Sequence, residues 1–239
     1  MSPRTADRDR RVRHALVVVL TVNAGATDSI GFLALGGAFT SVMTGNLVLL
    51  GISAAHADGS LARHTVTAIL CYVLGCILGA RLAGIARDGD RVWPAQITRA
   101  LTVELAVFGV YALGWWITDG RPVGAVQLGL LAVNAVGLGI QSSAVQRFGV
   151  SGLSTTYMTG TLTTLIVRLT SGHRLRDVMD SGQILLALIG GAVLSGVLNR
   201  YLTGWVPVLQ LVSIGGVIAA STLLTPLRRP EDAVDALRA

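Results

Sequence analysis

Lysine is absent from this 239-residue chain, and arginine supplies all nineteen of its basic Lys/Arg side chains. Without lysine there is no Gly-x-x-x-x-Gly-Lys-[Ser/Thr] phosphate-binding loop, so the chain is not by itself an ATP-driven pump. The sequence also lacks Gly-x-Ser-x-Gly, His-Glu-x-x-His and Cys-x-x-Cys motifs. These are the common signatures of serine hydrolases, zinc proteases and dithiol redox proteins. We therefore expect no enzymatic activity and no cofactor or metal.

Charged residues are also scarce, at 13% of the chain, whereas 52% of the residues are hydrophobic. A soluble globular domain carries about a quarter charged residues, so this composition predicts a membrane protein. The arginines gather at the ends of apolar runs, a pattern that is typical of membrane topology signals and not of a nucleic-acid surface. The expected partners are the lipid bilayer and an unidentified small solute. We expect no binding to nucleic acid, and the sequence does not decide whether the protein forms a homo-oligomer.

Eight apolar segments follow one another, and they predict an all-α polytopic integral membrane protein. They are residues 14–35, 39–55, 65–86 and 99–117, then 123–145, 152–169, 183–199 and 205–225. We expect a disordered basic cytoplasmic tail over 1–13, a first membrane repeat over 14–118, a second over 122–226 and a polar cytoplasmic tail over 227–239. The two repeats are expected to be homologous halves.

Recurring anchors in the same order are the evidence for the two halves. Met43-Thr44-Gly45-Asn46 returns 115 residues later as Met158-Thr159-Gly160-Thr161, and Gly75 returns 116 residues later as Gly191. One anchor does not fit the common interval between the two halves. Matching Asn23-Ala24 to Asn134-Ala135 gives an interval of only 111, which requires four inserted residues near positions 147–151.

The arginines also bear on the choice between eight spans and six. If all eight segments crossed the bilayer, six arginines would lie opposite the amino terminus. If 39–55 and 152–169 are re-entrant or broken, only Arg63, Arg121 and Arg200 lie there, and the positive-inside rule favours this arrangement. Three crossings per half also make the halves inverted repeats, which is a recurrent transporter architecture.

Two acidic residues lie inside apolar segments. Asp28 is far from either end of its segment, and an uncompensated carboxyl there costs about 2.5–3.5 kcal/mol on insertion scales. Asp28 either binds a proton or cation in an internal cavity or bonds a neighbouring helix, and both interpretations stay open. Glu104 is a second proton-coupling candidate, but it lies near a segment end, where Arg99 could neutralise it. Glu104 matches Gln210 in the second half.

The two Met-Thr-Gly motifs suit a helix break in a cavity, because glycine lets the backbone open and Thr and Asn side chains replace lost hydrogen bonds. The alternative is a close helix crossing through Gly45 and Gly160. On the first interpretation, a solute site lies near the bilayer midplane. Its predicted residues are Asn23, Asp28, Met43, Thr44, Gly45, Asn46, Gln141, Met158, Thr159, Gly160 and Thr161.

Three stretches carry a family resemblance: Asn23-Ala24-Gly25-Ala26-Thr27-Asp28, Phe32-Leu33-Ala34-Leu35-Gly36-Gly37-Ala38-Phe39 and Met43-Thr44-Gly45-Asn46. In them the chain resembles the YoaK family of bacterial inner-membrane proteins, a domain-of-unknown-function group often described as permease-like. The resemblance implies a multi-pass protein of the bacterial plasma membrane and no particular substrate. Thr161 stands where the first half has Asn46, so the two halves differ at this position.

These observations predict a permease-like small-solute transporter with both termini in the cytoplasm. Coupling to protons through Asp28 is an additional hypothesis. The alternative is a non-transporting membrane scaffold or assembly subunit, in which the polar residues only hold helices together.

Overall fold

The computed structural model describes residues 3–84, 93–147, 158–171 and 175–223, and every regular element within them is a helix. Six helices contain a stretch long and apolar enough to cross a membrane. They are α1 (Pro3–Ala34), α3 (Gly59–Ala83), α4 (Ala95–Ile117), α5 (Gly124–Gln146), α7 (Leu175–Tyr201) and α8 (Val206–Leu223), the last preceded by the short helix η1 (Thr203–Trp205). The predicted all-α polytopic membrane fold is confirmed.

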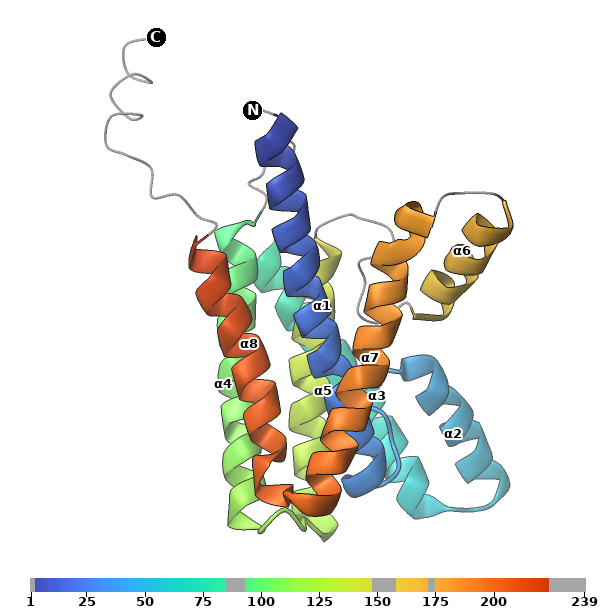
Figure 1. Cartoon of the computed structure of the whole chain (residues 1–239). Helices are drawn as coiled ribbons and strands as arrows, with labels where there is room; N and C mark the ends of the chain where they lie inside the picture. The colour runs from blue at the N-terminus through green and yellow to red at the C-terminus, as the bar shows by residue number, and fades with distance from the viewer. Residues whose placement is uncertain (1–2, 85–92, 148–157, 172–174, 224–239) are drawn as a thin grey trace.

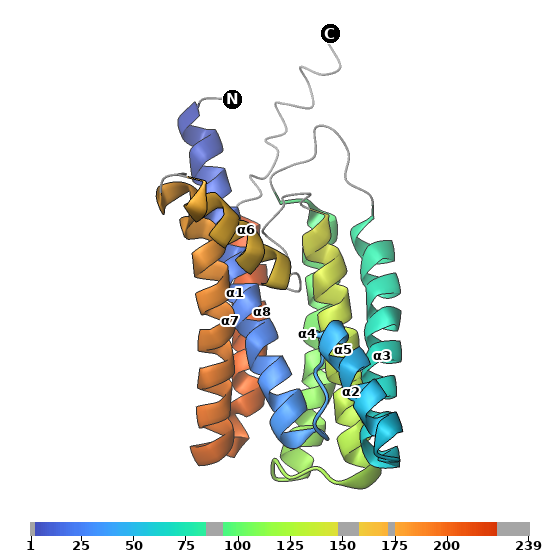
Figure 2. The same cartoon turned by 90° about the vertical axis from the view of Figure 1, so that its right-hand side faces the viewer.

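Two shorter helices, α2 (Met43–Ala55) and α6 (Met158–Thr170), have 13 residues each. At 1.5 Å per residue they are about 20 Å long, which is too short to cross about 30 Å of hydrocarbon. Each begins near the middle of the bundle and runs to the end at which the preceding long helix finished (Figures 1 and 2). Both therefore have the geometry of re-entrant segments.

The six long helices alternate in direction, and α8 finishes at the end of the bundle where α1 begins (Figure 1). In consequence α1 and α5, the first long helices of the two predicted halves, run in opposite directions. This is the relation expected of inverted repeats, in which each half crosses the membrane three times.

The helix α1 starts at Pro3 and so includes residues 3–13, whose polar sequence predicts a disordered tail. Arginine and alanine are good helix formers, and the long apolar helix that follows lets the first turns propagate from it. The predicted polar tail over 227–239 lies outside the described residues.

The start of α2 also differs from the predicted segment 39–55. After α1 the chain turns through Gly36 (φ +98°) and Gly37 (φ +77°), and it stays non-helical as far as Val42. The helix begins only at Met43, so the Met-Thr-Gly motif starts a helix and does not interrupt one. Likewise α6 begins at Met158, and the preceding residues 152–157 lie outside the described part.

A close crossing of α1 with α7 involves one glycine from each helix. A Cβ atom added at Gly25 would lie 2.1 Å from the carbonyl oxygen of Leu188. One added at Gly191 would lie 2.1 Å from the carbonyl oxygen of Val22. Only glycine therefore permits this backbone separation, as in small-residue packing of membrane helices.

A second close crossing joins α3 and α5 in the same manner. A Cβ atom at Gly75 would lie 2.2 Å from the Val136 carbonyl oxygen, and one at Gly139 would lie 2.3 Å from the Tyr72 carbonyl oxygen. The four contact positions repeat those of the α1–α7 crossing, with intervals of 114 residues between α1 and α5 and of 116 between α3 and α7.

This packing register corrects the predicted match of Asn23 with Asn134. Gly25 and Gly139 take the same place in their crossings, so the helices correspond at an interval of 114 and not 111. Backbone contact is the stricter criterion for matching the two helices. A close crossing requires glycine at one particular position, whereas a buried amide side chain can find a partner from several positions. The interval of 114 residues between α1 and α5 agrees to within one residue with the interval of 115 between the two Met-Thr-Gly motifs.

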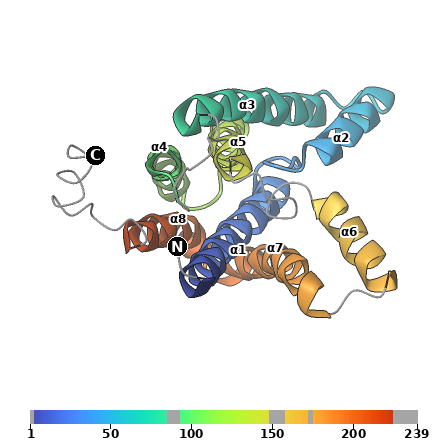
Figure 3. The same cartoon turned by 90° about the horizontal axis from the view of Figure 1, so that it is seen from above.

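The helices pack so that each predicted half reaches into the other (Figure 3). In the first half α1 contacts α7 and α8, and in the second half α5 contacts α3 and α4. The short helices α2 and α6 lie against α3 and α7 respectively, and α4 packs against α8. The described helices of the predicted repeats over 14–118 and 122–226 thus pack against one another across the boundary between the repeats.

Candidate functional site

A cavity of about 520 Å³ lies where the two short helices begin, among the residues that the structure describes. It is bordered by α1, α3, α5 and α7 and by the first residues of α2 and α6. Its lining residues are Asp28, Ser41, Val42, Met43, Thr44, Tyr72, Cys76, Ser142, Ser143, Gln146, Met158, Thr159 and Leu188.

The same two positions of each Met-Thr-Gly motif border this cavity. Met43 and Thr44 open α2, and Met158 and Thr159 open α6, so both short helices direct their N-terminal ends at one space. Half-membrane helices that begin at a midplane cavity are a recurrent arrangement in transporters. Five of the residues predicted from the sequence, including Asp28, are therefore brought together.

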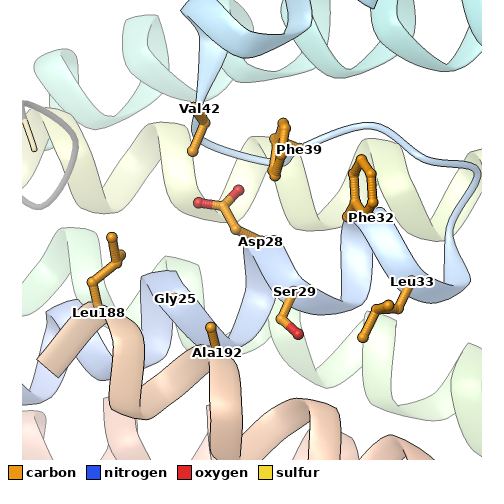
Figure 4. A pocket seen from close by; sticks show the side chains of 9 residues that line it. All are labelled: Gly25, Asp28, Ser29, Phe32, Leu33, Phe39, Val42, Leu188 and Ala192. Atoms are coloured by element: carbon orange, nitrogen blue, oxygen red, sulfur yellow. The ribbon is translucent and has the colours of Figure 1, made fainter. Parts of the chain in front are cut away.

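Asp28 contributes the one carboxyl group among the residues that line this cavity, although only 6% of the residue is exposed. Its Oδ1 atom accepts hydrogen bonds from Thr40 N (2.8 Å), Thr40 Oγ1 (2.9 Å) and Ser41 N (2.7 Å). Its Oδ2 atom accepts one from Ser41 Oγ (2.6 Å). These bonds compensate for burial of the carboxyl group, and they hold the non-helical chain that leads into α2. Figure 4 shows the carboxyl group directed from α1 toward Val42.

Asn46 fixes the same connection from the other side. Its Oδ1 atom accepts a hydrogen bond from Phe39 N (2.9 Å), and its Nδ2 atom donates one to Phe39 O (2.6 Å). The neighbouring Gly45 lies against Phe39 and Val42, where a Cβ atom would be 3.2–3.3 Å from their side chains. Both predicted residues therefore shape the entry to α2 and do not border the cavity.

Asn23 and Gln141 join α1 to α5 outside the cavity lining. Asn23 Nδ2 donates to Gln141 Oε1 (3.0 Å), and Gln141 Nε2 donates to Leu20 O (3.0 Å). Both side chains are fully buried. A further bond, from Gln210 Nε2 to Thr27 Oγ1 (2.9 Å), ties α8 to α1. This polar core holds the two halves together.

The remaining predicted residues of α6 do not border the cavity. Gly160 is exposed, and a Cβ atom there would meet no heavy atom within 4 Å. Thr161 is buried with 4% of its surface exposed. A close helix crossing through Gly160, the alternative weighed for this motif, is therefore absent from the described part of the chain.

Glu104 lies in α4, away from the cavity lining, and none of its surface is exposed. Neither carboxyl oxygen has a hydrogen-bond partner among the described residues, so Arg99 does not neutralise it as the sequence had suggested. The helices α4 and α8 run antiparallel, with Thr98 Oγ1 3.2 Å from Ser221 Oγ. This register puts Glu104 at about the level of Gly215.

Several cavity residues were not predicted from the sequence, among them Tyr72, Ser142, Ser143 and Gln146. The relation that identifies Ser142 comes from the helix packing and not from the sequence pattern. The interval of 114 set by the helix crossings makes Ser142 the counterpart of Asp28, so the same position of α1 and α5 borders the cavity. The second half thus offers a hydroxyl where the first offers a carboxyl.

Comparison with known proteins agrees with this architecture. The family model of DUF1275, described as "Protein of unknown function (DUF1275)", matches residues 16–222. The UPF0700 transmembrane protein YoaK of Bacillus subtilis (strain 168) is 33% identical over 154 residues, which are 64% of this chain and 66% of the relative. No solved structure matches the chain. The resemblance to the YoaK family is thus confirmed, and the chain belongs to the DUF1275 family of proteins of unknown function.

Proposed function

We propose that this protein is a permease-like transporter of a small solute, with its binding site in the 520 Å³ cavity. The observation that carries the proposal is the meeting of both Met-Thr-Gly motifs and a buried carboxylate at one space inside a six-span bundle. A polar cavity at the junction of two interlocked, oppositely directed halves is what alternating access requires. The proposal is one of transport and not of catalysis, and it needs no cofactor.

Asp28 gives the proposed site its preference for charge. Neither arginine nor histidine stands among the lining residues, and the chain has no lysine, so no basic side chain in the lining opposes this carboxylate. The site therefore favours a cation, or a proton in its place, and exchange of the two at Asp28 would couple transport to the proton gradient. Glu104, buried in the same bundle, is proposed as a second place where a proton can reside.

The orientation follows from the arginines. Arg63, Arg121 and Arg200 lie near the end of the bundle opposite the start of α1, at the beginning of α3, after α4 and at the end of α7. By the positive-inside rule we propose that the start of α1 and the end of α8 face the cytoplasm of a bacterial cell. The cavity then lies within the plasma membrane.

A structural role is the second candidate, because Asp28 is already occupied by four hydrogen bonds from residues 40 and 41. On this interpretation the carboxylate only anchors the entry to α2, and the protein is a scaffold or assembly subunit. Both candidates predict that loss of Asp28 affects stability. Only transport predicts a response to a solute.

The experiment is uptake of radiolabelled tetramethylammonium, a permanent small cation, into proteoliposomes with an imposed pH gradient. We expect saturable uptake above protein-free vesicles that responds to the gradient. Asp28→Asn should abolish uptake, whereas the exposed loop residue Asp119 should tolerate the same change to Asn. Wild-type uptake by purified, folded Asp28→Asn would remove the cation site and its coupling, and no uptake by the wild type would favour the structural role.

A further inference from the structure

A second hollow, of about 340 Å³, lies against the other side of Asp28, between α1, α7 and the chain leading into α2 (Figure 4). Its walls are almost entirely hydrocarbon and aromatic. They are formed by Gly25, Asp28, Ser29, Phe32, Leu33, Phe39, Val42, Leu188 and Ala192. The polar cavity of the proposed site does not explain this apolar hollow, which we call the lateral groove.

The lateral groove and the polar cavity meet at three residues. Asp28, Val42 and Leu188 line both of them. The carboxyl group thus stands at the junction between an apolar and a polar compartment. A molecule with its charged group at Asp28 and its apolar part in the groove would contact residues of both compartments.

The outer rim of the groove is formed by exposed apolar side chains of α1. Phe32 is 46% exposed and Leu33 is 59% exposed, and both lie on α1 inside the span that crosses the membrane. Both residues lie in the last turn of this candidate span, on its exposed surface. The groove is therefore open to molecules dissolved in the bilayer, and not only to those that arrive from water.

The charge at the end of the groove selects the kind of molecule. The lining residues include no basic side chain, and Oδ2 of Asp28 accepts one hydrogen bond where Oδ1 accepts three, so Oδ2 keeps capacity for a ligand. Two aromatic rings, those of Phe32 and Phe39, line the same groove. Phe32 and Phe39 stack with ring centroids 5.1 Å apart, and aromatic faces attract quaternary ammonium groups.

We propose that the lateral groove and Asp28 together bind a monovalent organic cation with an apolar body, which enters sideways from the bilayer. The ammonium group lies against Asp28, and the apolar body fills the groove between α1 and α7. This inference rests on the proposed function, because it names the substrate class of the same carboxylate site. It adds a route of entry and a requirement for an apolar part that the polar cavity alone does not impose.

The test is equilibrium binding of the fluorescent cation (2-naphthylmethyl)trimethylammonium to the full chain in lipid nanodiscs, with empty nanodiscs as the background for lipid partitioning. We expect saturable binding by the wild type. Two compounds with the same ring system, neutral 2-naphthalenemethanol and anionic 2-naphthylmethanesulfonate, should show no saturable binding. Tetramethylammonium, which lacks the apolar body, should bind at least tenfold more weakly.

Two variants separate the charge from the groove. Asp28→Asn should weaken binding of the naphthyl cation at least tenfold. Ala192→Phe should do the same by filling the groove from α7, without touching the hydrogen bonds of Asp28, and it should leave tetramethylammonium uptake unchanged. Val193→Phe is the matched control, because Val193 is 60% exposed on the same helix and does not line the groove.

The outcomes distinguish this inference from the proposed function. Equal binding of the cation and the neutral alcohol, or wild-type binding by folded Ala192→Phe, would overturn the inference even if tetramethylammonium uptake stands. Saturable binding that both variants abolish, in a protein that transports no tetramethylammonium, would support the groove site while removing the proposed transport of small cations.

Discussion

Gly191 of α7 lies directly against the backbone of Val22 in α1: a Cβ atom added at Gly191 would stand 2.1 Å from the Val22 carbonyl oxygen. The equivalent contact in the other crossing joins Gly75 of α3 to Val136 of α5, at 2.2 Å. These crossings hold the helices that carry Asp28 and the cavity walls. The site therefore depends on backbone contacts that a single methyl group can disturb.

The first prediction concerns this crossing. Gly191→Ala should lower the free energy of unfolding by roughly 1–3 kcal/mol, because the added methyl group has no room and the helices must separate. The control is the preceding residue, since a Cβ atom at Gly190 would meet nothing within 4 Å. Gly190→Ala should be neutral or stabilise the helix by up to about 1 kcal/mol. Thermal unfolding in detergent measures both, and equal effects of the two changes would contradict the crossing.

The second prediction concerns the bonds made by Asp28. Asp28→Ala leaves four donors of Thr40 and Ser41 without their acceptor, so unfolding should become easier by an amount on the order of 3 kcal/mol. Asp28→Asn keeps one acceptor oxygen and should cost less. A melting temperature for Asp28→Ala equal to that of wild type, by tryptophan fluorescence, would show that this hydrogen-bond cluster does not hold the entry to α2.

The third prediction concerns Glu104, which is buried without a hydrogen-bond partner in the described residues. Glu104→Gln places at position 104 the residue that the second half carries at position 210, and it removes any uncompensated charge. The variant should be at least as stable as wild type, whereas Glu104→Ala should lose roughly 1–3 kcal/mol through the cavity it leaves. If Glu104 also carries a transported proton, Glu104→Gln proteoliposomes should exchange tetramethylammonium across the membrane but no longer respond to a pH gradient.

A clear loss of stability in Glu104→Gln would contradict this view. It would mean that the ionised carboxylate makes a favourable contact that the described residues do not include. Melting temperatures of the two variants, measured side by side with wild type, decide between these outcomes.

The fourth prediction concerns topology. In a chain whose native cysteines are replaced, Arg63→Cys and Arg121→Cys should react with a membrane-impermeant maleimide on intact cells. Arg11→Cys should react only after the membrane is permeabilised. The position of Arg63 is decisive, because it faces outward only if α2 returns to the face from which it came. Labelling of Arg63→Cys only after permeabilisation would contradict the re-entrant placement.

Much of the fold could be predicted from composition and from the positions of the arginines. The six long apolar runs require membrane helices, because backbone polar groups cannot stay unpaired in lipid. The count of arginines on each side then favoured six spans, and the structure has six long helices. Gly36 and Gly37 marked the end of α1 correctly, since both adopt a positive φ that other residues rarely take.

The site could be predicted only in part. Asp28 and the first two residues of each Met-Thr-Gly motif border the cavity, since polar groups in lipid must be drawn into a shared interior. Asn23, Asn46 and Gln141 were also polar and in apolar segments, but their hydrogen bonds are taken by Gln141, Phe39 and Leu20. Sequence spacing does not reveal which polar side chains pair with one another.

The sequence by itself predicted a membrane protein, favoured six crossings over eight and placed two carboxyl groups, those of Asp28 and Glu104, inside apolar segments. These properties follow from hydropathy and charge, which act residue by residue. Only the tertiary structure decided that Ser142, and not Gly139 as the interval of 111 would give, is the counterpart of Asp28, and that Asp28 lines both the polar cavity and the apolar groove. Those relations depend on the close backbone contacts that Gly25 and Gly139 make with neighbouring helices. Contacts between segments that are distant in the sequence cannot be predicted from local sequence patterns.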